Sequence, residues 1–295
     1  MNYVLLGSLG NINRPLIGRL VAAGHHVSVI SSNPERSAAI IAAGARPLIG
    51  SIGDAGFLTT SFSGADAVYT MVPPHYTAPD WKEYIHQMGR NQAVAIQAAG
   101  VGKVVNLSSI GAHLPAGCGP VTGMHLAEQE LNALTDTDVI HLRASYFYTN
   151  FLSAIGMIKQ GGFYGNNYSA GRKLLLVSPA DIAEVAAEEL LELSFTGKSV
   201  RYVVSDELTS LEATSILGAA IGKPDLPYVE FSDEDALKGV LQAGFSEDIA
   251  CNFVELGRAT RTGEMFSDYV KHPVKLSQTK FRSFASDFAT AYAGV

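Results

Sequence analysis

Cysteine, long apolar runs and basic charge are all scarce in this 295-residue sequence. Its two cysteines, Cys118 and Cys251, lie far apart without CxxC or Cys/His ligand spacing, which excludes a disulfide framework and a cysteine-based zinc site. No stretch reaches the about 18 to 20 apolar residues of a membrane-spanning helix, and the first residues lack the basic and apolar segments of a secretory signal. We therefore expect a cytoplasmic protein with no membrane partner.

Charge is limited as well, at 17% of residues, and the formal net charge is −7. Binding to nucleic acid or to anionic membranes needs clustered Lys and Arg that neutralise phosphates, so this balance argues against both partners. It still permits a local basic pocket for a single phosphate. Hydrophobic residues make up 47% of the chain, which is ordinary for a folded protein of this length with a substantial core.

Strand and helix patterns alternate regularly in the first half of the chain. Helical patterns end at Gly24 and Gly44, and a longer helix is expected from about Pro79 to Gly100. Short apolar strands separated by helices predict a doubly wound parallel sheet of the α/β class, covered on both faces. The predicted strands are Tyr3–Leu6, His26–Ile30, Arg46–Ile49, Ala67–Met71, Lys103–Leu107 and Val139–Leu142.

The rhythm changes after about residue 150. Lys173–Val177 and Ser199–Val204 are strand candidates, and Ser178-Pro179 begins a helix. From Leu208 onward the signals are mainly helical. We predict a first domain over residues 1–150, joined by about 179–204, and a smaller, mostly helical C-terminal lobe over residues 151–295.

A glycine-containing turn follows the first predicted strand and begins the first helix. A pyrophosphate needs a tight turn, close backbone approach and free N–H groups at a helix N-terminus. Gly7 and Gly10 can supply the first two, and the amides of Leu9 to Ile12 the third. The position of this turn at the first βα junction predicts a dinucleotide-binding domain of the Rossmann type. The candidate contacts are Gly7, Ser8, Leu9, Gly10, Asn11 and Ile12.

The end of the second strand indicates which dinucleotide binds. An Asp or Glu there would hydrogen-bond the adenosine ribose and repel a 2′-phosphate. This chain instead has hydroxyl, amide and guanidinium groups, which suit a phosphate, so we predict NADP(H) rather than NAD(H). The alternative is that the arginine is simply a solvated helix residue. The residues concerned are Ser31, Ser32, Asn33 and Arg36.

Several segments, in this order and spacing, resemble the NmrA-like family of atypical short-chain dehydrogenases, related to isoflavone reductases and NAD(P)H:quinone reductases. The resemblance implies a Rossmann core, NADP(H) preference and a substrate cleft between core and lobe. It also implies that Val72, Pro73, Ser108, His125 and Tyr146 lie along the cofactor. The matching segments are residues 7–27, 31–36, 65–68, 72–75, 101–113, 123–128, 142–152 and 179–183.

The chain departs from the family at four positions. Asn13 stands where the phosphate turn usually has a third glycine, and Ser51 where relatives often carry an Asp that meets the adenine. Typical short-chain dehydrogenases use a Ser with a Tyr-x-x-x-Lys pair, in which the Tyr donates a proton. Here Val121 and His125 occupy the Tyr and Lys positions, so the usual carbonyl-reducing mechanism is absent.

Hydride transfer can still proceed by positioning alone when the acceptor is as reactive as a quinone. His125 is similar to the His of quinone-reductase relatives, where it would reach the nicotinamide ribose or the acceptor; the equal alternative is that it packs near Glu128. Tyr76 and Tyr148 are predicted to flank a flat acceptor, with His125 as the third catalytic candidate. Asp181 is expected to be structural, as an acid in the first turn of a helix.

Two functions follow from these observations. The first is an NADPH-dependent reductase of quinones or similar flat carbonyl compounds. The second is a non-catalytic NADP(H) sensor that acts through a partner protein, as the missing Tyr/Lys pair would allow. An epimerase or isoflavone-type reductase is disfavoured because position 125 lacks lysine. The predicted partner is a small quinone-like acceptor, and the helix from Pro79 to Gly100 is a possible homodimer face.

Overall fold

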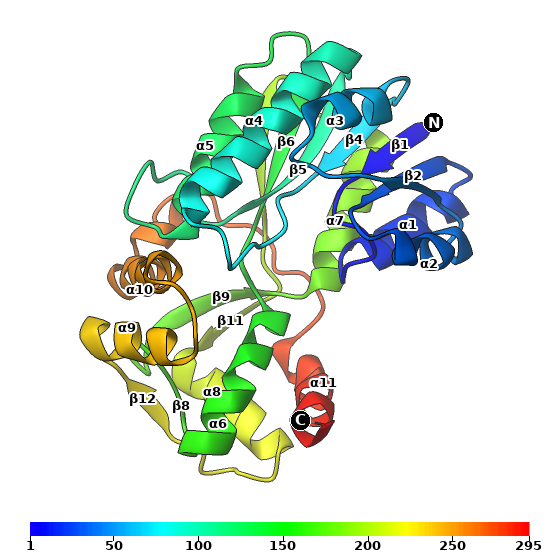
Figure 1. Cartoon of the computed structure of the whole chain (residues 1–295). Coiled ribbons are helices and arrows are strands. Elements are labelled where there is room, and N and C mark those ends of the chain that lie inside the picture. Colours follow the sequence, from blue (N-terminus) through cyan, green and yellow to red (C-terminus); the bar gives the residue numbers. More distant parts are fainter. Residues whose placement is uncertain (295) are drawn as a thin grey trace.

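The computed structural model describes residues 1–294, and a seven-stranded sheet forms its centre (Figure 1). The strand order is β10-β6-β5-β4-β1-β2-β3, and every neighbouring pair is parallel. This confirms the predicted doubly wound parallel sheet, with the reversal of strand order between β1 and β4. The strands are β1 (Asn2–Leu5), β2 (His26–Ser31), β3 (Arg46–Ile49), β4 (Ala67–Thr70), β5 (Lys103–Ser109), β6 (Asp138–Ala144) and β10 (Lys198–Val203).

Helices cover both faces of this sheet because its strands are apolar on both sides. Alternate residues of β1 show the division: Leu5 packs toward α1, α2 and α7, whereas Val4 packs toward α3, α4 and α5. Figure 1 shows these two helical layers on opposite sides of the strands. The helices are α1 (Asn13–Ala22), α2 (Ser37–Ala42) after the 3-10 helix η1 (Pro34–Arg36), α3 (Ala55–Phe62), α4 (Trp81–Ala99), α5 (Pro120–Asn132) and α7 (Pro179–Glu192).

Two glycines allow α4 and α5 to pack closely. A Cβ placed on Gly89 of α4 would lie 2.4 Å from the Cβ of Ala127 on α5. A Cβ on Gly123 of α5 would lie 2.6 Å from the carbonyl oxygen of Lys82 on α4. The long predicted helix is observed as α4, begun by Asp80, whose side chain accepts from the Glu83 amide. The close contact fixes α5 and its His125 relative to the sheet.

The C-terminal lobe combines helices with two small sheets, which the sequence patterns predicted only in part. Of their strands, β9 has the predicted bounds. The first sheet consists of β11 (Asp206–Thr209), β9 (Lys173–Val177) and β7 (Tyr146–Phe147), and the second of β12 (Tyr228–Glu230) and β8 (Tyr164–Asn166). The helices are η2 (Tyr148–Ala154), α6 (Ile155–Gly161), α8 (Ser210–Ala220), α9 (Asp233–Gln242), α10 (Glu247–Thr262), η3 (Glu264–Phe266), η4 (Tyr269–Lys271) and α11 (Phe281–Gly294).

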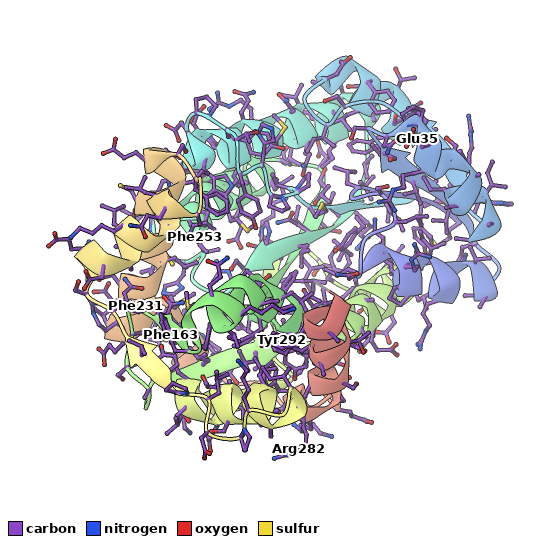
Figure 2. The ribbon with its side chains drawn as sticks, turned by 60° about the horizontal axis from the view of Figure 1, so that its bottom comes forward. Glu35, Phe163, Phe231, Phe253, Arg282 and Tyr292 are labelled. Carbon is purple, nitrogen blue, oxygen red and sulfur yellow. The ribbon has the colours of Figure 1, made fainter. Side chains whose placement is uncertain are left out.

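Helix α10 holds the lobe against the start of α4. The Trp81 amide donates to a carboxylate oxygen of Asp248 at 2.9 Å, and Lys82 pairs with Glu255 at 2.6 Å. Figure 2 labels Phe253 on α10, whose ring meets that of Trp81 edge-on at 5.3 Å. These contacts give the two parts of the molecule a packed junction beside the carboxyl ends of β4 and β5. Within residues 1–294, no helix has the length and apolarity needed to cross a membrane.

Candidate functional site

The turn after β1 has the conformation predicted for a phosphate-binding loop. Gly7 has a φ of 101°, a left-handed conformation that favours glycine, and Ser8 follows with a φ of 53°. The Ser8 amide donates to the carbonyl of Ile30 in β2 at 3.0 Å, which fixes the turn to the sheet. The chain then enters α1, whose leading amides have no intrahelical acceptors and carry the positive end of the helix dipole. This arrangement suits a pyrophosphate.

Asn13 takes a specific role at the position where the family resemblance implies a glycine. Its side-chain amide donates to the carbonyl of Leu6 at 2.7 Å and to that of Ser8 at 2.8 Å, and the residue is only 3% exposed. Both donors of one amide group therefore hold the two sides of the turn together. Asn13 therefore holds the turn through its side chain, where a glycine would act only by allowing close approach of helix and strand.

The predicted phosphate residues at the end of β2 divide into two groups. Ser31 is buried, and its hydroxyl accepts from the Ser8 hydroxyl at 3.0 Å and from the Asn33 amide at 3.2 Å, so it links the turn to β2. Ser32, Asn33 and Arg36 are exposed. The Asn33 carboxamide oxygen caps η1 by accepting from the Glu35 amide at 2.9 Å. In the described chain Arg36 has no ion pair within 4 Å, so its guanidinium is available to an anion.

The segment after β4 lies beside the turn. The side chain of Met71 packs under Gly7, where an added Cβ would lie 3.0 Å from its sulfur. The Met71 carbonyl accepts from the side-chain amide of Gln92 at 3.0 Å, which ties the segment to α4. Val72 and Pro73, predicted to contact the cofactor, follow and are half-buried. The reversal of strand order between β1 and β4 therefore places them next to the phosphate turn, where such folds bind ligands.

Ser108, another predicted cofactor contact, belongs to a buried ionic network that sequence reasoning missed. It is 4% exposed, and its hydroxyl donates to Glu128 at 2.5 Å. The same carboxylate pairs with Arg143 at 2.7 Å, and Arg143 also contacts Asp268 at 3.2 Å. Despite burial, the Glu128 carboxylate raises the pKa of Arg143, so it stays charged. The hydroxyl of Ser108 is thus engaged within the protein, and the network joins α5 and β6 to the chain after α10.

His125 lies half-buried on α5, with its Nδ1 2.9 Å from the carbonyl oxygen of Ala112. Because a carbonyl can only accept, Nδ1 is the donor in this contact, which leaves Nε2 as the ring nitrogen that a ligand can reach. This contact holds the ring in a defined orientation on the loop after β5. Val121, one turn earlier, packs in the core around Cys118 and Tyr202, so α5 presents an imidazole but no phenol.

A series of hydrogen-bonded polar side chains crosses the sheet from β4 to β6. The Thr70 hydroxyl donates to Asn106, the Asn106 amide donates to His141 at 3.0 Å, and His141 donates to Asn132 at 3.0 Å. His141 is 1% exposed, and burial lowers its pKa to about 4. The His141 ring is therefore uncharged at neutral pH. These hydrogen bonds link β4, β5 and β6 to the end of α5.

The three predicted aromatic residues lie in different environments. Tyr148 is 1% exposed, donates its hydroxyl to the Thr279 carbonyl at 2.7 Å and stacks edge-on with Phe281 at 5.1 Å. Its side chain thus belongs to the core of the lobe, and this placement does not support the predicted contact with an acceptor. Tyr146 is half-buried at the start of β7, with its ring edge-on to Phe151 at 5.4 Å.

Tyr76 is the most open of the three, at 45% exposure. Its ring meets Trp81 edge-on at 5.2 Å and Phe245 at 5.9 Å, so it bridges the loop after β4 and the lobe.

Asp181, expected to be structural, accepts from the Ser205 hydroxyl at 2.5 Å and from the Thr279 hydroxyl at 2.7 Å. It anchors the segment before α11 to α7, in addition to standing in the first turn of that helix.

The fold and the turn after β1 together define a dinucleotide-binding domain of the Rossmann type. Residues 7–192, more than half of the chain, match the model of a family described as NAD(P)H-binding. The chain belongs to this NAD(P)H-binding family, which confirms the predicted class of cofactor. No match is found among curated proteins. Among residues 1–294, no group of three or more His, Cys, Asp or Glu side chains could hold a metal ion.

Solved structures share the architecture over nearly the whole chain. The NADPH-dependent quinone oxidoreductase of Escherichia coli, complexed with NADPH, has a TM-score of 0.80 at 20% identity and covers 97% of this chain and 99% of its own. The triphenylmethane reductase of Citrobacter sp., complexed with NADP(H), has 0.78 at 21%, with 97% and 99% covered. A nucleoside-diphosphate-sugar epimerase of Staphylococcus aureus has 0.77 at 16%, with 97% and 100% covered. At these identities the likeness shows the fold, which serves more than one reaction.

Proposed function

We propose that the protein is an NADPH-dependent oxidoreductase that transfers a hydride to a quinone or a similar flat carbonyl acceptor. The observation that carries the proposal is the placement of two tyrosines, Tyr76 and Tyr146, at the carboxyl edge of a sheet whose first turn suits a pyrophosphate. Flat aromatic rings bind flat acceptors by stacking. Two solved proteins of this fold carry names that state reduction of quinones and of triphenylmethane dyes, which supports the same reaction class here.

The preference for NADPH over NADH rests on the end of β2. Ser32, Asn33 and Arg36 are exposed there, and no acidic residue stands at the strand tip. Glu35 is exposed on η1, at the outer surface of the molecule (Figure 2). A guanidinium with no protein partner can pair with a 2′-phosphate, whereas a ribose hydroxyl would gain little from it.

A reactive acceptor is part of the proposal because α5 lacks the usual proton donor. Val121 stands in the core at the position of the Tyr, and the Nδ1 of His125 lies against the Ala112 carbonyl. A quinone accepts a hydride with little assistance from an acid, since the negative charge that forms is delocalised over the ring. Positioning next to the nicotinamide, together with stabilisation of that charge, then supplies the catalysis.

The test follows NADPH consumption by absorbance with the purified protein and a panel of simple quinones, with NADH in parallel. We expect turnover with NADPH at a kcat/KM at least about tenfold above that with NADH, the value of one charge-assisted hydrogen bond. Absence of turnover with every quinone, while NADPH still protects the protein against heat, would reject the reductase and favour a non-catalytic NADP(H) sensor with a protein partner.

A further inference from the structure

Tyr146 and Tyr148 are separated by one residue, but their hydroxyl groups have opposite surroundings. The hydroxyl of Tyr148 is used inside the lobe, where it donates to the Thr279 carbonyl at 2.7 Å. Among residues 1–294, the hydroxyl of Tyr146 has no hydrogen-bond partner, and its oxygen is accessible to solvent. The Tyr148 hydroxyl therefore has a structural role, whereas the Tyr146 hydroxyl can bind a ligand.

The backbone of Tyr146 is held firmly although its hydroxyl is unpaired. Strand β7 pairs in parallel with β9, with Tyr146 opposite Leu176, and β9 is buried. The ring is fixed edge-on against Phe151, at 5.4 Å between centroids and 89° between planes. A residue held in this way loses little conformational entropy when its hydroxyl binds a ligand. This is the property expected of a group that positions a substrate.

The open phenol lies between the two parts of the molecule. Burial raises the pKa of Tyr146, and the nearby phenols of Tyr164, from the lobe, and Tyr76, from the loop after β4, raise it further. Tyr146 therefore keeps its proton at neutral pH and acts there as a neutral donor or acceptor. Tyr146 comes directly after β6, at the carboxyl edge of the sheet where such folds bind ligands.

We propose that Tyr146 donates a hydrogen bond to the acceptor oxygen that becomes negatively charged during reduction. This inference rests on the proposed function and adds to it a catalytic residue from outside α5. A quinone that receives one hydride gains two electrons and becomes a hydroquinone monoanion, while the reduced nicotinamide that supplies the hydride is oxidised by the same two electrons. The hydrogen bond from Tyr146 stabilises the anionic oxygen, and a proton from water completes the hydroquinone.

The chemistry of the chain explains why this donor is needed. The position that carries a phenol on α5 in typical relatives is Val121 here, and the Ser108 hydroxyl is engaged by Glu128. A donor that points at developing negative charge is worth about 100- to 1,000-fold in rate when it is the main one. Tyr146 replaces the missing phenol from a different element of the same sheet edge.

The experiment uses 4-nitrophenolate, an aromatic oxyanion, as a probe of the hydroquinone monoanion. Full-length wild type and Tyr146→Phe, each saturated with NADP⁺, are titrated with the probe at a pH at which it is ionised, and binding is followed by its absorption band. Tyr148→Phe is the matched variant, because it removes the same hydroxyl two residues away and keeps the ring. Heat protection by NADP⁺ reports for each variant whether the fold and the cofactor site are intact.

We expect Tyr146→Phe to bind the probe about 10- to 100-fold more weakly than wild type, the effect of one hydrogen bond to a charged group. Its kcat with a quinone should fall by about 100-fold. Tyr148→Phe should match wild type in probe binding. Equal probe binding by Tyr146→Phe and wild type, or no binding by either, would overturn the inference. A wild type without quinone turnover but with Tyr146-dependent binding would overturn the proposed reaction and leave this contact standing.

Discussion

Asn13 provides the most informative perturbation of the phosphate turn. Replacing it by Ala removes two hydrogen bonds, to the carbonyls of Leu6 and Ser8, from a side chain that is almost completely buried. Each such bond contributes about 0.5 to 1.5 kcal/mol net, so Asn13→Ala should lower the free energy of unfolding by about 1 to 3 kcal/mol. Asn13→Asp should cost more, because a carboxylate of the same shape brings acceptors, and a negative charge, against two carbonyl oxygens.

The assay has two parts. Urea unfolding of the apo protein gives the stability change, and NADPH titration followed by fluorescence gives the Kd. We expect both variants to bind NADPH more weakly, since the turn around Ser8, at a φ of 53°, is no longer held in place. Asn11→Ala, an exposed residue of the same turn, serves as control and should be within about 0.5 kcal/mol of wild type. If Asn13→Ala were as stable as this control and bound NADPH as tightly as wild type, these two hydrogen bonds would have no energetic role.

Three further predictions concern packing, pH and cofactor choice. Gly89→Ala should destabilise the protein by about 1 to 3 kcal/mol in urea unfolding, because the new Cβ meets the backbone of Ala127 at 2.7 Å. Gly18→Ala, with open space around it in α1, should instead stabilise by about 0.5 to 1 kcal/mol. His141 has a pKa of about 4 in the folded protein and of 6.5 in the unfolded chain, so between these values only the unfolded chain binds the proton. The free energy of unfolding should therefore fall by about 3 kcal/mol as the pH drops from 6.5 to 4, and His141→Gln should flatten that part of the curve. Arg36→Ala should raise the Kd for NADPH about tenfold and leave that for NADH unchanged in titrations, and equal effects on both would remove Arg36 from the phosphate site.

The main sheet could be predicted from the sequence because its strands are short apolar runs bounded by turn residues. β3 and β9 have the predicted bounds, and β10 was placed within one residue, although its position beside β6 depends on the crossover and not on its own pattern. The lobe was harder to predict. β7, β8 and β12 are two or three residues long, too short to show any periodicity, and their partners lie far away in the chain.

The candidate site was predictable in location but not in its side-chain roles. The turn at Gly7 follows a strand and precedes a helix, and such a position can be recognised locally. The engagement of Ser108 by Glu128, 20 residues later, depends on how α5 packs on β5, which no local pattern states. Tyr146 and Tyr148 look equivalent in sequence, but the chain leaves β7 for η2 between them, so the alternation of a strand no longer decides which side chain is buried.

Hydride transfer from NADPH to a quinone is the proposed reaction, and a single-turnover experiment examines it without interference from product release. Equal amounts of protein, NADPH and a simple quinone are mixed under anaerobic conditions, and NADPH loss and hydroquinone formation are measured together. We expect one hydroquinone for each NADPH consumed, at a rate far above that without protein and slowed by Tyr146→Phe. NADPH that stays bound and reduced, with the quinone unchanged at the uncatalysed rate, would contradict it.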